Sequence, residues 1–110
     1  MPPCEIIDWS TVPNRHVPGA SGDSFWRTAQ FADMRLRIVE YPVGYLADHW
    51  CELPHVIHLL AGAITIELAS GETFGLNAGQ TCRLAAGVPG HRVHTIGDAT
   101  AVAWIIDHLS

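Results

Sequence analysis

Apolar and polar residues alternate with a period of two along much of the chain. Ile64, Ile66 and Leu68 share one parity, and Thr65 and Glu67 have the other. Because successive side chains of a β-strand point to opposite faces, this alternation predicts a strand with one buried face. The same criterion, with enrichment in branched residues, predicts strands at residues 5–9, 25–31, 34–41, 45–51, 55–61, 63–68, 72–76, 81–85, 91–96 and 99–107.

Glycine and proline interrupt the chain too often for long helices. From residue 42 onward they occur at positions 42, 44, 54, 62, 71, 75, 79, 87, 89, 90 and 97. Many short strands with turn residues between them are typical of a closed antiparallel barrel or a two-sheet sandwich, so we expect an all-β fold. Residues 10–23 contain two prolines and two glycines and are expected to form an irregular arm.

Length and composition indicate one globular domain. The chain has 110 residues, of which 48% are hydrophobic and 15% charged, which excludes an intrinsically disordered chain. We therefore expect a single domain over residues 1–110. Residues 1–24 would form an N-terminal strand and the irregular arm, and residues 25–107 would form the barrel.

The charge distribution argues against nucleic acid and membrane partners. The formal net charge is −5, and the six basic residues are all arginines scattered singly along the chain. Without a basic stripe, nucleic acid and anionic membranes are not expected partners. Glu5 and Asp8 lie where a secretory signal needs basic residues, and the apolar window 59–64 is far shorter than the about 20 residues of a membrane-spanning helix. We expect a cytoplasmic protein.

Histidines cluster in two short segments. Three of the seven lie within residues 49–58, and His91 and His94 form the second group. On the predicted strand 45–51, His49 and Cys51 would point to the same face.

The chain turns at Pro54, so His55 can open a returning strand beside His49 and Cys51. Closure of the barrel would add His91 as a fourth group. Imidazole and thiolate donors suit Zn, Fe, Ni or Cu and disfavour Mg and Ca, so the four residues are candidate metal ligands. The alternative is that His49 and His55 are ordinary half-buried histidines and Cys51 a small core residue.

The same segment resembles the first motif of the cupin superfamily, in which a glycine precedes two spaced histidines, a glutamate and a second glycine. The positions that match in this chain are Gly44, His49, Cys51, His55 and Gly62. The stretch EYPVGYLADHWC at residues 40–51, followed by Pro54 and His55, resembles specifically the small single-domain DHCW motif cupins. The resemblance extends over most of the chain, from Trp26 to Asp107.

This resemblance implies a double-stranded β-helix, or jelly-roll, barrel with one metal site. The implied ligands are His49, Cys51 in place of a second histidine, His55 in place of the glutamate, and His91. The second cupin motif is looser, because Gly90 displaces His91 by one residue, and His94 remains an alternative distal ligand. A thiolate in place of a carboxylate shifts the preference toward softer metals, with Zn, Fe or Ni expected.

Three functions are compatible with such a site. One is a small-molecule metalloenzyme, dioxygenase-like or isomerase-like, whose metal keeps an open coordination position. The second is a non-catalytic metal or small-ligand binding or sensor barrel with a closed His3Cys site. The third is a structural barrel without metal.

Residues around the expected site add two further expectations. Tyr45 would either line its mouth or be an ordinary buried tyrosine. Arg37 and Arg83 would meet an acidic ligand if they face inward, although arginines on strands more commonly face solvent. We also expect a homodimer held partly by a sheet face that includes Trp50 and His58, since their parity turns them away from the metal side.

Overall fold

The structure, a computed structural model, describes residues 3–87 and 89–108. In this part of the chain no helix is long and apolar enough to cross a membrane. The elements are the 3-10 helix η1 (Trp9–Thr11) and the strands β1 (Arg15–Pro18), β2 (Asp23–Gln30), β3 (Met34–Tyr41), β4 (His55–Ala61), β5 (Ala63–Leu68), β6 (Thr73–Asn77), β7 (Thr81–Leu84), β8 (His91–Thr95) and β9 (Ala101–His108).

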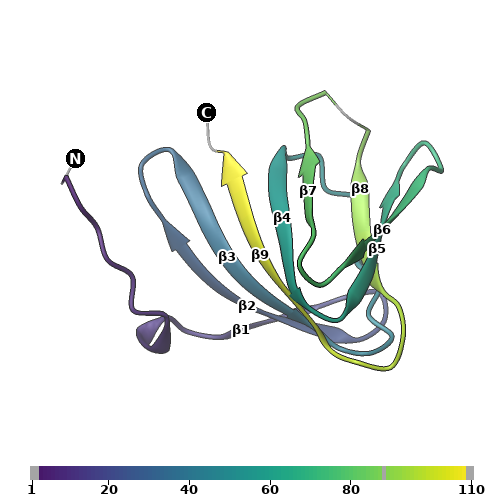
Figure 1. Ribbon diagram of the computed structural model, residues 1–110, viewed down its shortest axis with the longest axis horizontal. Coiled ribbons are helices and arrows are strands. Elements are labelled where there is room, and N and C mark those ends of the chain that lie inside the picture. The colour runs from purple at the N-terminus through teal and green to yellow at the C-terminus, as the bar shows by residue number, and fades with distance from the viewer. Residues whose placement is uncertain (1–2, 88, 109–110) are drawn as a thin grey trace.

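The strands form two antiparallel sheets. The larger has the order β1-β2-β3-β9-β4-β7, and the smaller has the order β6-β5-β8. In Figure 1 the long strands β2, β3 and β9 curve side by side, and the smaller sheet stands beside the β4 and β7 end of the larger one. The predicted all-β antiparallel fold is therefore confirmed.

The core lies between the two sheets and is built from the predicted alternation. In β5 the side chains of Ile64, Ile66 and Leu68 are buried and their neighbours are less so. Val39 of β3 and Leu59 of β4 supply fully buried side chains from the larger sheet. Burial of these branched side chains is the main free-energy gain of folding, and it fixes the register of each strand.

The N-terminal prediction is wrong in two places. Residues 5–9 do not form a strand; instead Asp8 caps η1, its carboxylate accepting a hydrogen bond from the Ser10 backbone N–H at 3.0 Å. Residues 10–23 are not wholly irregular, because β1 pairs with β2 at the edge of the larger sheet. Pro18 is compatible with an edge strand, where its missing N–H removes no ladder hydrogen bond.

The predicted strand 45–51 is an irregular segment in the structure. It follows a turn at Gly44, whose φ of 75° is left-handed, and it makes only isolated bridges. Leu46 makes two of these bridges, one to Ser21 between β1 and β2 and one to His94 of β8, and so links the β1–β2 connection to the smaller sheet. At another bridge Cys51 pairs with the first residue of β8.

Candidate metal centre

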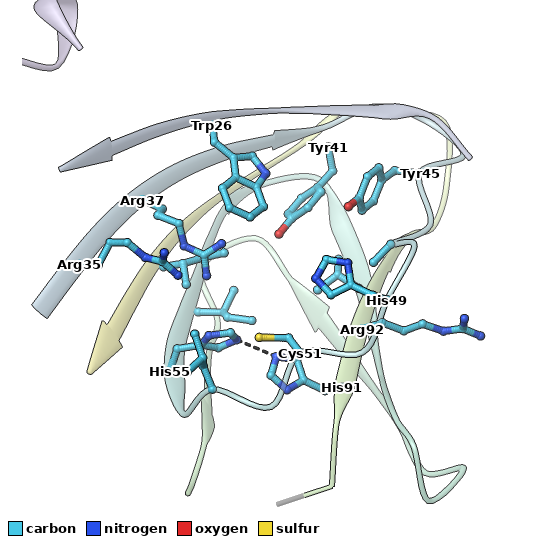
Figure 2. Close-up of a pocket in the computed structure, with 15 residues that line it drawn as sticks. Trp26, Arg35, Arg37, Tyr41, Tyr45, His49, Cys51, His55, His91 and Arg92 are labelled. Atoms are coloured by element: carbon cyan, nitrogen blue, oxygen red, sulfur yellow. Dashed lines mark hydrogen bonds between the residues drawn. The ribbon is translucent and has the colours of Figure 1, made fainter. Parts of the chain in front are cut away.

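Three side chains with metal-binding donor atoms meet inside the fold. One donor atom each of Cys51, His55 and His91 lies within 4.8 Å of the other two. His55 opens β4 and His91 opens β8, and both are 4% exposed. Their Nε2 atoms are 2.7 Å apart and their rings are nearly perpendicular, at 84°. Figure 2 shows the Cys51 sulfur beside the two facing rings.

A pair of backbone hydrogen bonds places Cys51 next to the histidines. The Cys51 N–H donates to the His91 carbonyl at 2.7 Å, and the His91 N–H donates to the Cys51 carbonyl at 2.9 Å. This single antiparallel bridge gives an irregular segment a fixed position relative to β8. Three of the four candidate ligands named from the sequence are therefore brought together.

The fourth candidate, His49, lies at the rim of the same pocket and outside this cluster. Its side chain is 75% exposed, and its Nδ1 lies 2.6 Å from a carboxylate oxygen of Asp48. Strand parity does not apply to it, because the segment before Cys51 is not a strand. The alternative ligand His94 also lies outside the cluster and lines a different pocket, together with Glu67.

Asp107, which is not among the site residues predicted from the sequence, orients one ring of the cluster. Its carboxylate is fully buried, and its Oδ1 lies 2.9 Å from Nδ1 of His55. Since an ionised carboxylate only accepts hydrogen bonds, a neutral His55 carries its hydrogen on Nδ1 and presents the Nε2 lone pair to the cluster. A carboxylate that fixes a histidine tautomer in this way is a common outer partner of metal-binding histidines.

Two arginines hold the Asp107 carboxylate. Arg37 donates from Nε to Oδ2 and from Nη2 to Oδ1, both at 2.9 Å, and Arg35 donates from Nε to Oδ2 at 2.6 Å. Burial opposes ionisation of this carboxyl, but the hydrogen bonds from His55, Arg37 and Arg35 outweigh it and hold the pKa of Asp107 below its usual range. Asp107 is therefore an anion at neutral pH.

His91 is also in the protonation state that a metal ligand needs. Burial, and then the neighbouring His55 and Arg37, lower the pKa of His91 to about 4. The imidazole is therefore neutral at physiological pH and keeps one nitrogen lone pair for a metal.

The cluster forms one side of a pocket of about 260 Å³. Tyr41 and Tyr45 line the opposite side, with ring centroids 4.9 Å apart, and Figure 2 shows both hydroxyls directed into the space above Cys51. Burial raises the pKa of both tyrosines, so both hydroxyls keep their hydrogens. Tyr45 lines the pocket, as expected, but it is only 5% exposed and also packs in the hydrophobic core.

The donor chemistry fits a transition metal. A thiol and two imidazoles, one of them oriented by a buried carboxylate, form a set of nitrogen and sulfur donors that suits borderline or soft ions. Cys51, His55 and His91 could hold such an ion from one side, and the pocket occupies the other side.

Comparisons with known proteins identify the fold. No family model and no curated protein matches this sequence. Among solved structures, a sugar phosphate isomerase of the cupin superfamily from Silicibacter pomeroyi is similar over 96% of this chain and 76% of its own, with a TM-score of 0.77 and 16% identity. A predicted oxalate decarboxylase from Thermotoga maritima matches 96% of this chain and 100% of its own, with a TM-score of 0.79 and 14% identity.

A polyketide cyclase from Streptomyces resistomycificus is similar over 97% of this chain and 80% of its own, with a TM-score of 0.77 and 16% identity. At these identities the likeness defines the fold alone. The chain has the cupin fold, as the resemblance of its sequence to the cupin superfamily implies.

Proposed function

We propose that this protein is a metal-binding cupin that acts as an enzyme on a small molecule in the pocket. The observation that carries the proposal is the meeting of Cys51, His55 and His91 beside a cavity of about 260 Å³. A bound Zn, Fe or Ni ion would supply Lewis-acid or redox chemistry. The chain itself would hold two neutral imidazoles toward the ion, shield the site from bulk water and orient the ligand.

The position of His49 favours an open site over a closed one. A closed His3Cys centre is the alternative, a non-catalytic binding or sensor barrel, and it would require the exposed His49 to leave Asp48 and turn inward. With His49 at the rim, Cys51, His55 and His91 would supply three donors to a four-coordinate ion, which would leave one position for a ligand. An open position is what a catalytic metal needs.

The reaction is proposed as isomerase-like or dioxygenase-like. The sugar phosphate isomerase among the structural neighbours supports the first of these, as a precedent for the fold. We also propose that the chain is a cytoplasmic, single-domain DHCW motif cupin and a homodimer. The motif at residues 40–55 supports the subgroup, and the exposed Trp50 supports the interface.

Metal analysis of protein purified without a histidine tag tests the site. The wild-type chain should retain a stoichiometric transition metal, whereas Cys51→Ser, His55→Ala and His91→Ala should each lower metal affinity by about tenfold or more. His94→Ala is the matched control, because it removes a histidine outside the cluster.

The cobalt-substituted protein should show a thiolate charge-transfer band that disappears in Cys51→Ser. Unchanged metal content in all three cluster variants would contradict the proposal. A loss of metal in His49→Ala as large as in His91→Ala would instead favour the closed binding site.

A further inference from the structure

The pocket beside the cluster carries an excess of positive charge, although the whole chain is acidic. Three of the six arginines line it, Arg35, Arg37 and Arg92, and its described lining contains no aspartate or glutamate. Two carboxylates form ion pairs with these arginines. Glu67 pairs with Arg92, and Asp107 pairs with both Arg35 and Arg37. Three guanidinium groups against two carboxylates leave one positive charge at the pocket.

The carboxylate of Asp107 leaves the outer edges of its two arginines unused. Its two oxygens already face four donor atoms, from His55, Arg37 and Arg35. Among the described residues, Arg35 makes its hydrogen bond through Nε only, and Arg37 makes none through Nη1. These outer N–H groups belong to side chains that line the pocket, so a ligand can reach them.

The position of the Arg37 guanidinium is fixed before any ligand arrives. Besides its two bonds to Asp107, its Cζ lies 4.6 Å from the centroid of the Trp26 ring. Arg37 is also buried, so its charge acts in a region of low dielectric constant. A donor held in place in this way loses little conformational entropy when it binds a ligand.

Tyr41 adds a neutral donor from the opposite wall. The structure gives its hydroxyl no hydrogen bond to another described residue, and Figure 2 shows the hydroxyl directed into the pocket on the side of Arg37. Other parts of the lining are apolar and come from both sheets, including Ile57, Val93 and Ile105. The pocket thus combines a polar corner of N–H and O–H donors with an apolar remainder.

We propose that this corner, formed by Arg35, Arg37 and Tyr41, binds the carboxylate of a small ligand whose body is apolar. The proposal rests on the proposed function, because it names the substrate class of the same pocket. In the metal-free pocket the single excess positive charge matches a monocarboxylate, and guanidinium N–H groups bind carboxylates in a planar arrangement. The cavity volume limits the body of the ligand to about the size of one ring or one short branched chain.

The experiment uses benzoate as the probe and benzamide as its neutral match, with dissociation constants measured by NMR titration of labelled protein. Benzoate should bind about tenfold more tightly than benzamide, as expected for a hydrogen-bonded charge. Both titrations are done on metal-loaded and on chelator-treated protein. Benzoate should still bind the chelator-treated protein, because the arginines and Tyr41 do not depend on a metal.

Two variants and one control locate the binding corner. Tyr41→Phe removes the hydroxyl and keeps the ring, and Arg35→Gln removes one guanidinium; each should weaken benzoate binding by about tenfold. Arg27→Gln makes the same charge change on β2 outside the pocket and should leave binding unchanged. Thermal melting checks that each variant is folded, and Tyr41→Phe decides the matter if Arg35→Gln does not fold.

Several results would overturn the carboxylate site. They are equal affinities for benzoate and benzamide, tighter binding of inorganic phosphate than of benzoate, unchanged affinity in Tyr41→Phe, and loss of benzoate binding on chelation. The metal proposal fails separately. Wild-type protein that binds no transition metal but still prefers benzoate would refute the metalloenzyme and leave the carboxylate site standing.

Discussion

Asp107 is the buried carboxylate around which the polar part of the site is organised, and its replacement by asparagine tests that role. In Asp107→Asn the remaining oxygen can still accept from His55 and from Arg37 Nη2. The new amide nitrogen, however, would face the Nε–H groups of Arg35 and Arg37, so donors would oppose donors. Because Asp107 is 0% exposed, the two guanidinium groups would also lose their only buried counter-charge in the described structure.

Breaking a buried ion pair by removal of one partner typically costs about 3–5 kcal/mol, and we expect a loss of unfolding free energy in that range. Urea denaturation measures it. Glu67→Gln is the control, since it neutralises a carboxylate in a partly exposed pair with Arg92 and should cost about 1 kcal/mol or less. A cost in Asp107→Asn no greater than in Glu67→Gln would refute the reasoning.

The same variant has a defined pH dependence. The pKa of Asp107 is lowered in the folded state, whereas the unfolded carboxyl titrates near 3.8. Its contribution to stability is therefore complete above that value and is lost as the pH falls below it. The difference in unfolding free energy between wild type and Asp107→Asn should be constant from pH 7 to about 5 and should narrow below about pH 4. A difference that widens with acid would contradict the assignment.

Three further predictions concern the framework. In urea denaturation, Gly62→Ala should lower the free energy of unfolding by about 2 kcal/mol or more. Gly62 has a φ of 77°, and a Cβ there would lie 2.8 Å from backbone atoms of Thr100 and Ala101. The control Gly75→Ala, which has open space around it, should be within about 1 kcal/mol of wild type. In denaturation, Leu59→Ala should cost about 2–5 kcal/mol because Leu59 is 0% exposed, whereas the same change at Leu60, 51% exposed, should cost less than about 1 kcal/mol. Light scattering should give twice the mass of one chain at micromolar concentration, and a monomeric mass would refute the homodimer predicted from Trp50 and His58.

Most strands could be predicted because their burial depends on local alternation. The period-two pattern of residues 63–68 and 34–41 matches β5 and β3 to the residue. The segment 45–51 is also expected to be a strand but is not one, because its bridge partners are isolated residues on different parts of the fold. Such partners depend on tertiary contacts, which the alternation of a single segment does not encode.

The site was only partly predictable for a similar reason. Cys51, His55 and His91 carry recognisable donor atoms, so their residue types and the family resemblance were enough to select them. Asp107 offered one signal, a carboxylate with the same parity as the buried Ala103 and Ile105 at the end of an apolar strand. A charge on a buried face needs partners, but the sequence does not say that these are Arg35, Arg37 and His55.

Asp107 contacts both the metal cluster, through His55, and the two arginines of the carboxylate-binding corner. Variants should therefore differ in whether they weaken metal binding, benzoate binding or both. Asp107 uses the Nε edge of both arginines and leaves their outer edges to a ligand, so a bound carboxylate need not displace it. Tyr41→Phe should therefore weaken benzoate binding by about tenfold while metal content stays at the wild-type level. Asp107→Asn should lower both, because a neutral amide oxygen accepts from His55 more weakly than a carboxylate does, and the amide nitrogen no longer accepts from the Nε–H groups of the two arginines. If Asp107→Asn lowered metal affinity but left benzoate affinity unchanged, the arginines would be held by contacts other than Asp107, and the link between the metal cluster and the carboxylate-binding corner would be wrong.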